Sequence, residues 1–273
     1  QDQALDALGG KHHAQLHLAS ATNDLLPFTR IQQLGGDINP RNKCGCTPLH
    51  NAAMCGHVQV CEFILINCKE KNPVNDLGET PLHHAAQRGY LSLCEVMMRF
   101  ATDKSPRNNM GATPIHHAAL YSHLDVYKLM LEKCRDPNPG DNSGATPIHY
   151  AASKGHLVVC WFMMKKLKDK NPKNEEGHTP LHVAANNGHH LVVEMILRSV
   201  SEKNPMCSKM ATPLHLAVGK GHLKVIHIIA KHVKDLSPKD DMGKTPLHWA
   251  VESGQIEVVK FLLDHMNEKN PKA

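Results

Sequence analysis

The sequence repeats one seven-residue segment at a constant interval of 33 residues, and its clearest copy reads Thr-Pro-Leu-His-Val-Ala-Ala at residues 179–185. A constant period of this length is typical of arrays in which each unit packs only on its neighbours. Such a chain grows in one dimension, so the period outweighs the one or two globular cores that 273 residues would otherwise suggest. The copies begin at Thr47, Thr80, Thr113, Thr146, Thr179, Thr212 and Thr245.

Each copy carries the start and stop signals of two short helices. Thr179 is predicted to cap the first helix, and Pro180 to occupy its first position, where the missing amide hydrogen costs nothing. Gly188 favours a left-handed end to that helix. The apolar spacing of residues 157–164 indicates a second helix. In every copy a proline, which cannot continue a helix, follows shortly after this segment. These prolines are Pro40, Pro73, Pro106, Pro139, Pro172, Pro205, Pro238 and Pro271.

Three positions depart from the repeated pattern. Asn23 and Ser122 stand where the other copies end the first helix with glycine. Asparagine tolerates the left-handed conformation, whereas Ser122 is expected to be slightly strained. Met210 replaces the glycine that precedes each repeated threonine, so we predict that the turn at residues 206–211 is irregular.

The repeat resembles the ankyrin repeat, which shares its 33-residue period and its Thr-Pro-Leu-His-x-Ala signature. The resemblance covers nearly the whole chain. It implies an all-α-dominated solenoid of helix–loop–helix units with β-hairpin or turn connections. We expect a single ankyrin repeat domain over residues 1–273. Its units are a degenerate copy at 9–41 and then 42–74, 75–107, 108–140, 141–173, 174–206, 207–239 and 240–273.

The second helices and the last copy differ from the family pattern. Most second helices lack the glycine that usually follows them in the family, so we expect another cap geometry there. The last copy keeps an apolar second helix, whereas a terminal repeat normally has a polar outer face. Because the sequence also stops just after Pro271, our hypothesis is that it is a segment of a longer protein.

Composition argues against several classes of partner. The net charge of +5 arises from 31 basic and 26 acidic residues, a balance that favours neither nucleic acid nor an anionic membrane. With two Trp, four Tyr and five Phe, a base-stacking surface is not expected. The longest apolar run, residues 157–164, is too short to span a bilayer.

Nine cysteines without the spacing of a disulfide framework indicate reduced thiols. Cys61, Cys94 and Cys160 share a repeat position with Val193 and Ile226, which identifies it as a core position. The N-terminal stretch shows no signal-peptide pattern. We therefore expect a cytoplasmic or nuclear protein.

Twenty-two histidines invite a metal-binding or catalytic interpretation. Eight belong to the repeated signature, where the resemblance implies a structural hydrogen-bonding role, and five more open second helices. His84 and His117 share a repeat position, but stacked helices lie about 8–10 Å apart, which is far for two ligands of one zinc ion. His13 and His17 are four residues apart, yet Ala14 aligns with the capping threonine, so we do not expect them on one helical turn.

Other chemical motifs receive a structural interpretation. The basic cluster at residues 165–170 suits the end of a helix, with a lipid or phosphate contact as the alternative. Cys44 and Cys46 lack a second pair of ligands for zinc. Phosphate loops, nucleophile elbows and the His-Glu-x-x-His motif do not occur. We expect no metal, no cofactor and no enzymatic activity.

Function is expected where the copies differ while their framework stays the same. In the family these positions are the hairpin tips and the ends of the first helices, which line the concave face. Leu120 and Tyr121 stand where a soluble surface usually carries polar groups, and Tyr, Arg and Met are enriched at interface cores. Alternatively, Leu120 packs between repeats and Tyr121 is an isolated exposed aromatic. The candidate protein-binding residues are Leu77, Arg88, Asn109, Met110, Leu120, Tyr121, Asn142 and Lys154.

These features predict a scaffold for protein–protein interaction that binds a partner protein or peptide on its concave face and hairpin tips. We expect a monomer with no nucleic-acid partner and no transmembrane segment in this chain. The alternative keeps the fold and changes the setting. The array would then be the cytoplasmic ankyrin module of a larger channel, kinase or ubiquitin-ligase adaptor, acting as a regulatory or elastic element.

Overall fold

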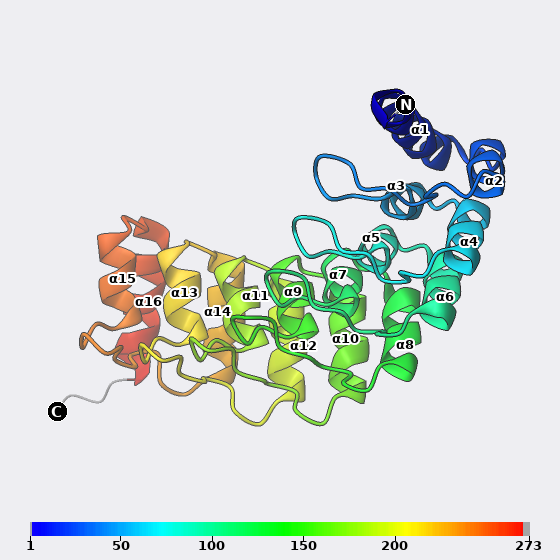
Figure 1. Cartoon of the computed structure of the whole chain (residues 1–273). Coiled ribbons are helices and arrows are strands. Elements are labelled where there is room, and N and C mark those ends of the chain that lie inside the picture. Colours follow the sequence, from blue (N-terminus) through cyan, green and yellow to red (C-terminus); the bar gives the residue numbers. More distant parts are fainter. Residues whose placement is uncertain (1, 270–273) are drawn as a thin grey trace. The chain divides into compact units, whose positions relative to one another are not determined.

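The structure is a computed structural model that describes residues 2–269. The described chain forms sixteen helices and no strand, and it divides into two compact units, residues 1–141 and 142–273 (Figure 1). Unit 1 contains α1 (Asp2–Thr22), α2 (Leu26–Gln33), α3 (Pro48–Cys55), α4 (Val58–Asn67), α5 (Pro81–Arg88), α6 (Leu91–Phe100), α7 (Pro114–Leu120) and α8 (Leu124–Lys133). Unit 2 contains α9 (Pro147–Ser153), α10 (Leu157–Lys166), α11 (Pro180–Asn186), α12 (His190–Ser199), α13 (Pro213–Gly219), α14 (Leu223–His232), α15 (Pro246–Glu252) and α16 (Ile256–Lys269).

In each unit the helices stack in two rows. In unit 1, α1, α3, α5 and α7 pack in sequence on one another, while α4, α6 and α8 form the second row (Figure 1). In unit 2, α9, α11, α13 and α15 form the first row, and α10 and α14 pack on either side of α12. The connections between repeats are turns, so the predicted fold, an α-helical repeat solenoid, is confirmed.

The repeated threonine, proline and histidine together start the first helix of each repeat. Thr179 is extended (φ −95°, ψ 167°) and Pro180 is the first helical residue, as predicted. The Nδ1 atom of His182 accepts the amide hydrogen of Thr179 at 3.1 Å. Its Nε2–H donates to the carbonyl of Ala211 in the next repeat at 3.2 Å. The signature histidine thus links the cap of its own helix to the following repeat.

In most repeats a second histidine forms a hydrogen bond to the repeat before it. His123 lies at the start of α8 and donates from Nε2 to the carbonyl of Gln87 at the end of α5, at 2.9 Å. Its ring covers Gly89, which ends α5 with φ +75°. A Cβ at Gly89 would lie 2.3 Å from Nδ1 of His123. This glycine is therefore required both by its backbone conformation and by the close approach of the histidine.

The exceptions at the helix ends behave as predicted. Asn23 and Ser122 replace glycine and keep its left-handed conformation, with φ of 60° and 65°. A serine pays a steric penalty there because it has a Cβ, whereas asparagine is better tolerated. Ser122 is therefore a site of local backbone strain.

The turn at residues 206–211 does not follow its prediction. Its backbone hydrogen bonds, from Cys207 N–H to Ala211 O and from Met210 N–H to Cys207 O, match those of the other repeats. The prediction of an irregular turn is wrong, because Met210 adopts the glycine conformation with φ 54°. Backbone bonds from Ser208 N–H to Glu176 O and from Asp241 N–H to Lys209 O hold the turn on both sides.

The core consists of small residues between first helices and larger apolar residues under the second helices. Ala184 and Ala185 are fully buried, which lets neighbouring first helices approach closely. Cys61, Cys94 and Cys160 are fully buried as well, so the assignment of their repeat position to the core is confirmed. Burial raises the thiol pKa of all three, to about 12 for Cys94 and Cys160.

The second helices from α4 to α14 end without a left-handed residue, whereas α2 is followed by Gly35 with φ +72°. Their C-cap residues are extended; Cys68, for example, has φ −93° and ψ 149° and donates its amide hydrogen to Ile64 O at 2.8 Å. The ammonium group of Lys71 donates to the carbonyls of Leu65 and Cys68 at this end. The other cap residues of this kind are Ala101, Cys134, Leu167, Val200 and Val233.

The first helix departs from the repeat alignment. Because α1 runs from Asp2 to Thr22 without a break, His13 and His17 lie one turn apart on one helix, and the contrary prediction is wrong. The first copy has no Thr-Pro pair at residues 14 and 15, so nothing in the sequence starts the helix there. The last repeated proline, Pro271, lies outside the described residues.

Candidate protein-binding face

The tips of unit 1 form a continuous ladder. The amide of Asp76 donates to Cys44 O at 3.2 Å, and that of Asn109 donates to Leu77 O at 3.0 Å. The Asn109 side chain adds a bond from Nδ2 to Asp76 O at 2.9 Å. Each tip is therefore held by the next, which reduces the conformational entropy that remains to be lost when a partner binds.

Two large apolar side chains project from these tips. Leu77 is 64% exposed and Met110 is 69% exposed. The turn beneath Leu77 is fixed because Oδ1 of Asn75 accepts the amide hydrogens of Leu77 and Glu79 at 3.0 and 2.9 Å. The same repeat position carries Ser143, Glu176 and Lys209 in the next three copies. The framework thus accepts polar residues here and does not require apolar ones.

The ends of α5 and α7 carry the other predicted residues of unit 1. Tyr121 directly follows α7 and is 45% exposed. Its hydroxyl oxygen accepts a hydrogen bond from Nε2 of Gln87 at 3.0 Å. Arg88 is exposed in the last turn of α5, whereas Leu120 is only partly exposed. The structure therefore joins Tyr121 to the preceding repeat and leaves Leu120 a partly structural role.

A polar cluster that sequence reasoning missed lies between the first helices of unit 1. The two carboxylate oxygens of Glu79 lie 3.6 Å from Nε2 of His84 on α5 and 3.7 Å from Nε2 of His117 on α7. All three side chains are largely buried. Burial lowers the pKa of both histidines, and the Glu79 carboxylate opposes this shift. Both histidines are therefore mainly neutral at pH 7.

This cluster belongs to the same helix faces as the predicted residues. His84 lies one turn before Arg88 on α5, and His117 lies one turn before Tyr121. The spacing of the helices was considered only for a shared zinc ion, and it did not indicate that Glu79 contacts both rings. A signal was present in the sequence, since Glu79 stands at a position that holds alanine in three other copies.

The geometry of these groups does not define a metal site. Within residues 2–269, no group of three or more His, Cys, Asp or Glu side chains is arranged to hold a metal ion. None of the helices in that range is both long enough and apolar enough to cross a membrane. All nine cysteines are free thiols.

Two of the predicted residues belong to unit 2. Asn142 is an exposed tip residue, and Lys154 is exposed directly after α9. The tips of this unit are also joined, by backbone bonds such as that from Glu175 N–H to Ser143 O at 2.9 Å. The predicted set therefore consists of six residues in unit 1 and two in unit 2.

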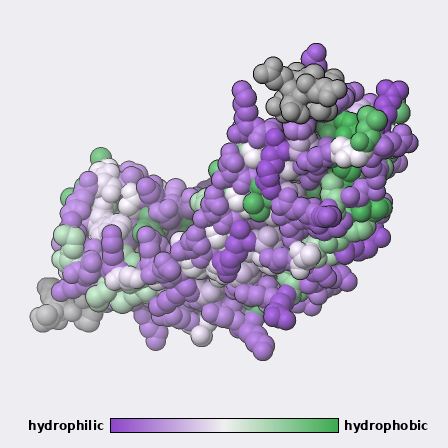
Figure 2. Space-filling model, viewed as in Figure 1, coloured by the Kyte–Doolittle hydropathy of each residue, from purple (hydrophilic) through white to green (hydrophobic). Residues whose placement is uncertain are grey.

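The face of the molecule seen in Figure 2 is largely polar, with an apolar area over the part of unit 1 that carries α2 and α4. Leu26, Leu34 and Ile66 are exposed apolar residues of this region. They lie outside the predicted set.

The comparison with protein families agrees with this architecture. The family described as ankyrin repeats (3 copies) matches residues 16–101, 61–141, 96–174, 134–206 and 181–273. The overlapping matches cover the chain from residue 16 to residue 273, and the chain belongs to the ankyrin repeat family. Ankyrin repeats are generally modules of protein–protein interaction. A search of curated proteins gave no match.

Proposed function

We propose that this chain binds a partner protein or peptide through the tips and the first-helix ends of unit 1, and that it has no enzymatic activity of its own. The observation that carries the proposal is the pair of exposed apolar residues, Leu77 and Met110, on tips that a backbone ladder holds in place. Large apolar residues on a rigid framework lose little conformational entropy on binding, and the burial of their apolar surface contributes favourable free energy.

The helix ends supply the polar part of the same surface. Arg88 is an exposed cation, and Tyr121 presents an aromatic ring whose hydroxyl is oriented by Gln87. Tyrosine and arginine are among the residues that most often dominate binding energy at protein interfaces. A partner segment with apolar anchors and an acidic group matches this combination. Asn142 and Lys154 extend the proposal to unit 2, and Leu120 contributes mainly by supporting Tyr121.

The proposal includes a single ankyrin repeat domain that acts as a monomer in the cytoplasm or nucleus. The nine free thiols support such a reducing location. The balanced charge supports a protein partner over a nucleic acid.

The test places a photo-crosslinking amino acid at Met110 or at Tyr121 and exposes each protein to a cell lysate. Both positions should label the same partner, which mass spectrometry would identify. The variants Met110→Glu and Tyr121→Lys use residues that other copies carry at these positions, Glu176 and Lys154. Each should reduce binding of the identified partner by tenfold or more while the melting temperature stays within a few degrees.

A matched control is Glu176→Ala, a change at the equivalent tip of unit 2, which should leave binding unchanged. Labelling of unrelated proteins from the two positions would contradict the proposal. So would unaltered affinity in both variants. An array that serves only as an elastic element would yield no specific partner from either position.

A further inference from the structure

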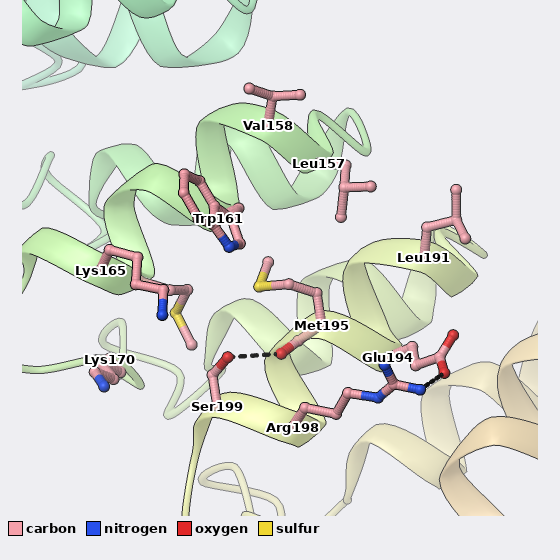
Figure 3. Close-up of a pocket in the computed structure, with 11 residues that line it drawn as sticks. Leu157, Val158, Trp161, Lys165, Lys170, Leu191, Glu194, Met195, Arg198 and Ser199 are labelled. Carbon is pink, nitrogen blue, oxygen red and sulfur yellow. Dashed lines mark hydrogen bonds and ion pairs between the residues drawn. The ribbon is translucent and has the colours of Figure 1, made fainter.

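The second helices of unit 2 carry a groove that the proposed function does not use. The groove lies between α10 and α12 and encloses about 760 Å³ (Figure 3). Trp161 on α10 and Met195 on α12 lie on its two sides, and Leu157 and Leu191 lie towards one end. A volume of this size is within the range of sites that accept several side chains of a ligand.

Three apolar side chains of this groove face solvent. Val158 is 62% exposed, Trp161 is 52% exposed and Leu191 is 54% exposed. Isolated exposed apolar residues are common, but three that line one groove form a patch. Packing within the chain therefore does not explain why these three positions carry large apolar residues.

The other repeats show that the fold does not need apolar residues at these positions. All repeats have a similar backbone, so residues at equivalent positions show which side chains the fold accepts there. The position of Trp161 carries Glu62, Glu95, Lys128, Glu194, His227 and Lys260 in the other copies. The position shared by Val158 and Leu191 carries Gln59, Ser92, Asp125, Lys224 and Glu257. The degenerate first copy carries Leu26 at this position, and among the seven complete copies apolar residues stand there only in two neighbouring repeats, where they line one groove.

The opposite end of the groove is positively charged. Lys165 and Lys170 lie there, and Nζ of Lys165 is 5.9 Å from the centre of the Trp161 ring (Figure 3). Across the described part of the chain, neither lysine forms an ion pair with an acidic side chain. Arg198 is paired with Glu194, the one acidic residue that lines the groove. The lysine end therefore has uncompensated positive charge.

We propose that this groove binds an amphipathic helix of a partner protein that carries apolar residues on one face and acidic residues at one end. Residues 157–165 of α10 extend over about 12 Å, which matches roughly two turns of a bound helix. Apolar side chains spaced at i, i+3 or i+4, and i+7 would contact Trp161, Val158 and Leu191. The acidic end would lie over Lys165 and Lys170, where complementary charge sets the orientation and speeds association.

The test uses a displayed library of 16-residue helical peptides on an alanine-rich background, with eight randomised positions along one face. Selection against the whole chain should enrich peptides with three apolar residues at helical spacing and with Asp or Glu at one end. Binding of the enriched peptides should fall at least tenfold in Trp161→Glu and in Leu191→Lys. It should fall several-fold in Lys165→Glu and weaken with added salt.

These variants are designed to keep the fold. Each introduces a residue that another copy carries at the same position: Glu194 for Trp161, Lys224 for Leu191 and Glu132 for Lys165. Circular dichroism and the melting temperature check the folding of each. The matched control is Ile66→Glu. It replaces an exposed apolar residue of α4 with glutamate, which another copy carries at the same position as Glu132. It should leave peptide binding unchanged.

Several results would overturn the inference. Enriched peptides that bind Trp161→Glu and Leu191→Lys as tightly as the parent chain would show that the groove is not their site. Enrichment of basic instead of acidic ends would refute the charge argument. If the selection enriches no peptide, and the parent chain binds vesicles of anionic phospholipid while Trp161→Glu does not, the groove would be assigned to a membrane surface. Dimerisation that this variant abolishes would assign it to a second copy of the chain. Met110→Glu should leave the selected peptides bound, so this test and that of the proposed function fail independently.

Discussion

Acidification should unfold this protein through the buried signature histidines. Burial lowers the pKa of His50 to about 4 and those of His83 and His182 to about 3. In the unfolded chain each of these pKa values returns to about 6.5. The folded state therefore binds fewer protons, and the stability that each neutral histidine contributes is complete above pH 6.5. It is lost progressively as the pH falls below 6.5 towards the folded-state pKa.

The magnitude follows from the linkage relation. As the pH falls below 6.5, the number of protons bound at each of these histidines approaches one in the unfolded chain, while in the folded chain it stays close to zero down to pH 5. At about 1.36 kcal/mol per pH unit and proton, each histidine lowers the free energy of unfolding by about 2 kcal/mol at pH 5. His50 and His83 are both in unit 1, which should therefore lose about 4 kcal/mol. Because a typical domain is stable by only about 5–15 kcal/mol, this loss is decisive.

The assay is urea unfolding followed by far-UV circular dichroism at pH 7, 6 and 5 at constant ionic strength. The midpoint should fall at each step. A variant His83→Gln keeps a donor and an acceptor but cannot be protonated in this range, so its midpoint should depend less on pH. Equal midpoints at pH 7 and 5, or an unchanged pH dependence in this variant, would refute the reasoning. A fall in midpoint as the pH rises from 5 to 7 would show that the sign is wrong.

Three further predictions concern the backbone and the thiols. Met210→Gly should raise the free energy of unfolding by about 1 kcal/mol, because it removes a Cβ from a left-handed residue; a lower urea midpoint would contradict this. Gly89→Ala should cost about 2 kcal/mol or more, since its Cβ would meet His123, whereas Gly254→Ala has open space around it and should cost about 1 kcal/mol; equal losses in urea unfolding would argue against the histidine contact. Iodoacetamide at pH 8 should alkylate exposed Cys44 and Cys55 but leave buried Cys94 and Cys160 unmodified in the native protein, as mass spectrometry would show, and labelling of all four at one rate would contradict their burial.

The family and the order of helices could be predicted because the same local signals recur. Thr179 and Pro180 start a helix through their own backbone preferences, and Gly188 ends it for the same reason. Such signals act within a few residues, so they can be recognised in a sequence. The prediction failed at α1, where the Thr-Pro pair is missing and the helix runs from Asp2.

The candidate site could be predicted only in part, because exposure depends on neighbouring repeats. The sequence indicated that Leu120 and Tyr121 differ from the framework, but the structure shows Leu120 partly buried and Tyr121 hydrogen-bonded to Gln87. The repeat spacing suggested that His84 and His117 are too distant to be ligands of one zinc ion, and it gave no indication that one carboxylate contacts both. A helix-to-helix distance omits the reach of side chains, and Glu79 enters from the tip between them.

The sequence by itself determined the repeat, the residues that start the first helices, and the left-handed residues that end them. These features depend on backbone preferences and on contacts repeated in every unit, so one copy explains the others. The tertiary structure decided which varied residues meet across repeats. Trp161 and Leu191 are thirty residues apart and belong to different copies, yet they line one groove. Contacts of this kind depend on the stacking of adjacent repeats, which brings together side chains that no local sequence pattern connects.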